Sequence, residues 1–106
     1  MEVFGMNKST FTKLVDSGSS PPEGLSGPLL ALCLGRRGDW EASHALVNEM
    51  DTSLGSWIHA WLHRVEGDLP NARYWYGMAG RAEAEGELEE EWEELTVVAL
   101  AAPSSD

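Results

Sequence analysis

The chain has 106 residues, of which 42% are hydrophobic, and a formal net charge of −11 at pH 7. This length suits one domain, and this apolar content excludes an intrinsically disordered chain. The longest apolar run, residues 95–102, is far shorter than the roughly 20 residues that span a bilayer. The first eight residues lack the basic start and apolar stretch of a signal peptide, and the single cysteine excludes an internal disulfide framework. We therefore expect a cytoplasmic protein.

The acidity is concentrated towards the C-terminal end. Residues 1–82 carry seven Lys/Arg and nine Asp/Glu, whereas residues 83–94 carry eight glutamates and no basic residue. Phosphate backbones and anionic membrane surfaces require a basic face, so we expect neither nucleic acid nor a membrane as a partner. The glutamate-rich segment is interpreted as a solvated helix face, with contact to a basic protein as the alternative.

Apolar periodicity, caps and breakers predict an all-α bundle of five to six helices within one helical domain, residues 1–106. A short helix is expected over residues 9–15, followed by a Pro/Gly/Ser-rich connector to residue 27. Pro28 suits the first position of a second helix, which ends near residues 35–38. Asp39 then caps a third helix over about residues 40–50. Residues 28–50 therefore form a first hairpin.

A second hairpin is expected over residues 52–80, and an acidic amphipathic helix over residues 86–102. Thr52 or Ser53 opens the fourth helix, Asp68 caps the fifth, and Gly80 ends it. In the last helix the apolar residues recur on one face and glutamates occupy the other. The apolar set is Leu88, Trp92, Leu95 and Ala99. We expect this helix to cap the stack or to form a homodimer contact through Trp92 and Leu95.

The two hairpins share a Gly-Asp corner. Gly38-Asp39 and Gly67-Asp68 are 29 residues apart, and each lies between a helix and its successor. An alanine stands seven residues before each glycine and a small residue five after it, which lets the paired helices approach closely. These spacings predict tetratricopeptide-like hairpins, although the usual repeat is about 34 residues long.

The stretch from Trp57 to Gly80 resembles a group of small microbial proteins that carry the pattern W-x-H-A-x-x-H-R-x-E-G-D-x-x-N-A-x-Y-W-Y-x-x-A-G. Residues 38–40 and 88–93 are similar to further parts of that pattern, and the likeness covers most of residues 22–95. The resemblance implies the helical-hairpin fold and marks positions, but it implies no reaction. The chain departs from the pattern at Gly77-Met78, where the group has a longer polar or basic side chain.

Three polar residues of the fourth helix, His59, His63 and Glu66, are spaced i, i+4, i+7 and therefore share one stripe of the helix. Two imidazoles at i, i+4 can grip a metal ion, with the carboxylate completing part of its shell and His44 approaching from another helix. The alternative is that the imidazoles are semi-buried struts, bonded to carbonyls or to polar groups of the fifth helix.

A third interpretation of this region is a small-ligand or peptide site. Asn71, Tyr74, Trp75 and Met78 share one flank of the fifth helix, which can face the stripe of histidines in an antiparallel hairpin. Asn71 and Tyr74 are also the polar groups to which histidine struts would bond. Aromatic walls with a few polar groups are typical of ligand pockets, although tryptophans in so small a bundle also act as volume fillers.

These patterns favour a non-catalytic helical module that binds a protein or a small molecule and needs no cofactor. The predicted binding residues are His59, His63, Glu66, Asn71, Tyr74 and Trp75, and no catalytic residue is predicted. The alternative is a small metal- or histidine-dependent enzyme centred on His59 and His63, with Glu66 as ligand or base. The metalloprotease pattern is absent because Ala60, not a glutamate, follows the first histidine.

Overall fold

The structure is a computed structural model that describes residues 6–18 and 21–102. Within these ranges it contains six α-helices and no strand, which confirms the all-α prediction. The helices are α1 (Lys8–Ser17), α2 (Gly27–Arg36), α3 (Trp40–Asn48), α4 (Ser53–Val65), α5 (Leu69–Ala79) and α6 (Leu88–Ala101). Residues 1–5 of the N-terminal segment and residues 19–20 of the expected connector lie outside the described residues. None of the six helices is both long and apolar enough to cross a membrane.

Short polar side chains begin most of the helices. Asp39 and Asp68 start α3 and α5, because their carboxylates accept hydrogen bonds from first-turn N–H groups. Thr52 caps α4 in the same way. In α1 the cap is Asn7, so this helix begins slightly earlier than the sequence predicts. Gly80 ends α5 with a φ of 72°, a left-handed conformation that glycine adopts without strain.

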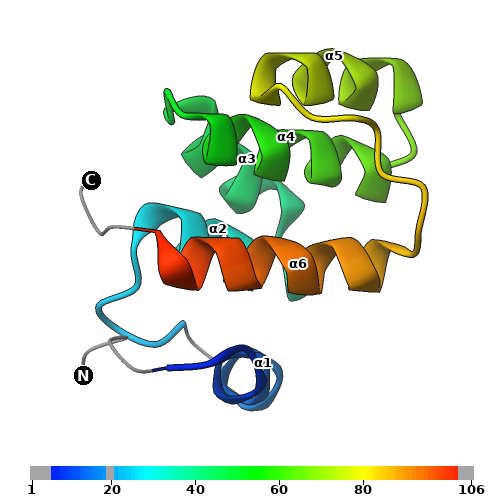
Figure 1. The fold of residues 1–106 in the computed structure, drawn as a ribbon. Coiled ribbons are helices and arrows are strands. Elements are labelled where there is room, and N and C mark those ends of the chain that lie inside the picture. The colour runs from blue at the N-terminus through cyan, green and yellow to red at the C-terminus, as the bar shows by residue number, and fades with distance from the viewer. Residues whose placement is uncertain (1–5, 19–20, 103–106) are drawn as a thin grey trace.

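The helices are stacked in tiers (Figure 1). α5 lies at one end of the molecule and returns antiparallel to α4, with α3 behind α4. The next tier places α6 in front of α2, and α1 lies across the other end. α4 is the central element, since it packs against α2, α3, α5 and α6, and every residue from 57 to 63 is buried.

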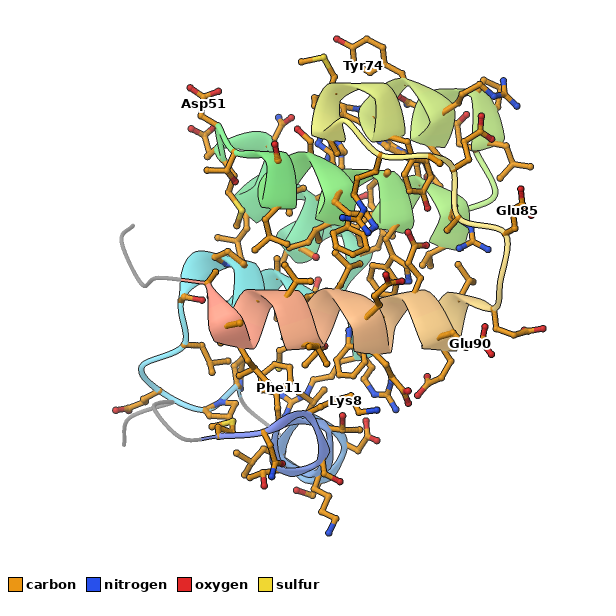
Figure 2. The ribbon with its side chains drawn as sticks, in the orientation of Figure 1. Lys8, Phe11, Asp51, Tyr74, Glu85 and Glu90 are labelled. Atoms are coloured by element: carbon orange, nitrogen blue, oxygen red, sulfur yellow. The ribbon has the colours of Figure 1, made fainter. Side chains whose placement is uncertain are left out.

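The apolar face of α6 is used inside the chain. Trp92 and Leu95 are 1% and 0% exposed, and the Trp92 indole N–H donates to the Leu32 carbonyl at 2.9 Å. The Trp92 ring also stacks on Phe11, with 5.9 Å between ring centroids. Figure 2 shows Phe11 reaching from α1 towards α6. Trp92 and Leu95 are therefore buried inside the chain, in contact with α1 and α2.

One glutamate of α6 departs from the expected solvated face. Glu91 is only 3% exposed, and its carboxylate accepts hydrogen bonds from the Trp57 indole at 2.9 Å and the Tyr76 hydroxyl at 2.6 Å. Arg64 donates to the other carboxylate oxygen at 2.6 Å. Burial, followed by the hydrogen bond to Glu91, raises the pKa of Tyr76, so the phenol stays protonated as a donor. This carboxylate joins α6 to both α4 and α5.

Replacing Glu91 with alanine should therefore destabilise the protein strongly. Glu91→Ala leaves the Arg64 guanidinium and two buried donors without their acceptor, and breaking a buried pair in this way costs about 3–5 kcal/mol. Glu94→Ala is the matched control on the same helix, because its pair with Arg81 is exposed and worth at most about 1 kcal/mol. Urea unfolding of both variants measures the difference. Equal losses would show that Glu91 does not hold α6 in place.

Candidate functional site

All three histidines of the chain lie together where α3, α4 and α5 meet. The Nε2 atoms of His44 and His59 are 3.0 Å apart, which is hydrogen-bond distance. The rings of His59 and His63, one turn apart on α4, stack with 5.1 Å between centroids. One ring nitrogen from each residue lies within 4.8 Å of the others. We term His44, His59 and His63 the histidine cluster.

Two tryptophans hold the rings of this cluster. The Trp75 indole lies flat on His59, with 3.8 Å between centroids and 10° between planes. Trp40 stacks on His44 at 4.6 Å and 11°, and its N–H donates to the Leu62 carbonyl at 2.7 Å. Because the indole of Trp40 is anchored to the backbone of α4, the ring of His44 is directed towards His59.

Glu66 orients the third histidine. Nδ1 of His63 lies 2.7 Å from a carboxylate oxygen of Glu66, one turn later on the chain. A carboxylate accepts hydrogen bonds, so Nδ1 of His63 is the donor in this contact. His63 is buried, whereas the Glu66 side chain is 38% exposed. Asp68 lies close to this pair but also caps α5.

The imidazoles of His44 and His59 are held in their neutral form. Burial, reinforced by the neighbouring His44 and His63, lowers the pKa of His59 to about 4. Burial and then repulsion from His63 lower the pKa of His44 as well. In the contact between His44 and His59 one ring therefore donates its proton and the other accepts, while both remain uncharged at neutral pH.

The structure brings together four of the six predicted binding residues, His59, His63, Glu66 and Trp75, and leaves two outside. Asn71 is exposed and donates to Asp68 at 3.3 Å. Tyr74 is 58% exposed and projects outward from α5 (Figure 2), with its ring perpendicular to that of Trp75.

The separation of Tyr74 from the cluster follows from helix geometry. Successive residues are about 100° apart around the axis, so α5 can direct Trp75 towards His59 while Tyr74 lies in solvent. The expected struts from the histidines to Asn71 and Tyr74 are replaced by contacts of the histidines with one another, with Trp75 and with Glu66.

Trp40 is the residue of this region that the sequence patterns missed. Trp40 and His44 are spaced i, i+4 on α3, and this spacing is the signal that places them on one face of that helix. The face can be recognised as part of a site only when the packing of α3 against α4 is known.

No family model, curated protein or solved structure matches the chain. Three imidazoles and a nearby carboxylate offer ligand atoms to a cation or hydrogen bonds to a polar ligand.

The lowered pKa of His59 predicts a pH dependence of stability. A histidine has a pKa near 6.5 in the unfolded chain and here about 4 in the folded one, so the unfolded state binds more protons between these values. The contribution of neutral His59 to the free energy of unfolding is fully present above pH 6.5. It is lost as the pH drops towards 4, and the loss is on the order of 3 kcal/mol.

Urea unfolding of the wild type and His59→Leu between pH 7.5 and 4, in buffers with a chelator, measures this contribution. The other titratable groups are present in both proteins, so the difference between the two curves of unfolding free energy against pH reports His59. A difference that stays constant across this range would contradict a neutral, buried His59.

Proposed function

We propose that this protein is a non-catalytic binding module whose ligand site is the histidine cluster. In this proposal α2–α3 and α4–α5 are tetratricopeptide-like hairpins that serve as the scaffold, and α6 caps them. The small residues at equivalent positions of the two hairpins support this arrangement, because each is at most 2% exposed at the helix contact. These residues are Ala31, Ser43, Ala60 and Ala72.

The observation that carries the proposal is the choice of residues around α4. Its buried face towards α3 and α5 holds two imidazoles at positions where apolar side chains would fill the same space. A structural polar residue behaves differently. The buried Ser43 hydroxyl has a backbone acceptor, the Ala31 carbonyl, at 2.7 Å, whereas His59 is hydrogen-bonded to another titratable ring. Residues that bring polarity into a core without helping to assemble it are typical of functional sites.

The cluster is within reach of solvent. His44 and Trp75 are half-buried, and the Glu66 side chain is 38% exposed, so the site borders the surface along α3 and α5. A small ligand could therefore enter without unfolding a helix. We further propose that the group of proteins resembled by the Trp57–Gly80 stretch uses the same positions for binding.

Leucine substitutions distinguish a binding site from a set of structural struts. In metal-free protein, His44→Leu should destabilise by about 1–3 kcal/mol, because it leaves Nε2 of buried His59 without its partner. The double variant His44→Leu/His59→Leu removes both partners and should be as stable as the wild type or more stable. Thermal melting followed by circular dichroism provides the measurement.

The matched control is Ser43→Ala, which removes the buried hydrogen bond from the Ser43 hydroxyl to the Ala31 carbonyl and should lower stability by about 1 kcal/mol. If the double histidine variant loses at least as much stability as the sum of its single variants, the cluster is structural and the proposed site is wrong.

A further inference from the structure

We propose that the ligand of the histidine cluster is a divalent transition metal ion of the zinc class, held by His44, His59 and His63. This inference rests on the proposed function, because it names the ligand of the same site. The spacing of the ring nitrogens, the groups that orient the rings and the chemistry of the donor set support it.

The spacing of the nitrogens suits an ion. Zn²⁺ binds imidazole nitrogen at about 2.0–2.1 Å in tetrahedral geometry, which places two such nitrogens about 3.3 Å apart. The Nε2 atoms of His44 and His59 are 3.0 Å apart, so a small rotation of one ring reaches that value. A nitrogen of His63 lies within 4.8 Å of both. An organic group does not fit between nitrogens that are this close, whereas a metal ion does.

Each of the three rings is oriented by a second residue, and for His63 this residue is a carboxylate, as is usual for metal-binding histidines. Glu66 accepts the Nδ1 proton of His63 at 2.7 Å, which presents Nε2 to the ion. Trp75 fixes the plane of His59, and Trp40 fixes the plane of His44. Glu66 is therefore a positioning residue in this proposal.

The donor set determines the class of metal. Three imidazoles suit Zn²⁺, Co²⁺, Ni²⁺ and Cu²⁺, whereas Mg²⁺ and Ca²⁺ prefer oxygen ligands. The single cysteine, Cys33, is buried on α2 and belongs to neither ligand group found among the described residues. Three protein ligands leave one tetrahedral position for water or for another ligand.

Metal titration of the full chain tests this inference. The protein is prepared with any affinity tag removed, stripped with EDTA, and titrated with Co²⁺ while visible d–d absorption is recorded. We expect one equivalent of Co²⁺ to bind with the intense band of a low-coordinate nitrogen site and to be displaced by Zn²⁺. The melting temperature should rise with Zn²⁺ concentration.

Three variants make the test specific. His44→Leu removes a ligand and should weaken Co²⁺ binding by at least 100-fold. Glu66→Gln should weaken it by about 10- to 100-fold at unchanged stoichiometry, as loss of a group that orients a ligand does. Glu49→Gln, at the exposed end of α3, should have no effect. If His44→Leu does not fold, Glu66→Gln decides alone, and an unchanged affinity in that variant overturns the inference.

The inference is also overturned if no Co²⁺ band appears at millimolar ion or if His44→Leu binds Co²⁺ as tightly as the wild type. These results are distinguishable from failure of the proposed function. Absence of metal binding together with a stable His44→Leu/His59→Leu variant leaves the site in place and rejects the metal. Absence of binding together with a strongly destabilised double variant rejects both.

Discussion

The enclosure of α4 by four other helices is the constraint on which the rest of the structure depends. Because residues 57–63 are all buried, every polar side chain in that stretch needs a partner inside the protein. Trp57 and Trp61 find theirs in α6, whereas His59 and His63 lie against α3 and α5. α4 thus has two polar edges, one facing α6 and one facing α3 and α5.

These two edges meet the requirement in different ways. Glu91 is a buried charge whose oxygens receive an arginine and two neutral donors, so its desolvation is offset by a complete set of partners. In the histidine cluster His44 and His59 are hydrogen-bonded only to each other among the bonds described, and a carboxylate, that of the partly exposed Glu66, is bonded to His63 alone. A structural role requires that a buried polar group has all its hydrogen-bond partners. A ligand site requires ring nitrogens that the rest of the protein leaves available. This contrast is the physical reason for assigning function to one edge and stability to the other.

Much of the fold could be predicted from local signals, because helix caps act over three or four residues. Asp39, Asp68 and Gly80 mark the bounds of α3 and α5 in the sequence as they do in space. The stripe of His59 and His63 follows from helical spacing alone.

The remaining features depend on how the helices pack. His44 reaches the stripe only through the packing of α3 against α4, and Glu91 is buried only because Arg64 and Tyr76 are presented to it. Periodicity on one helix contains neither relation. The exclusion of Tyr74 in favour of Trp75 likewise depends on the rotation of α5 about its axis, which a shared flank in the sequence does not fix.

The electrostatics of the cluster separate a proton from a metal ion as its occupant. Burial disfavours positive charge on His44, whereas the nearby carboxylates of Glu66 and Glu41 favour it. For a proton burial dominates, and the pKa of His44 is lowered. Burial penalises a divalent ion still more than a proton, so the proposed metal ion depends on direct bonds from three nitrogens, which replace its lost hydration. The same carboxylates attract this ion, and the net charge of −11 adds a long-range attraction that concentrates cations around the chain. In the proposed site coordination therefore offsets the burial that keeps a proton from His44.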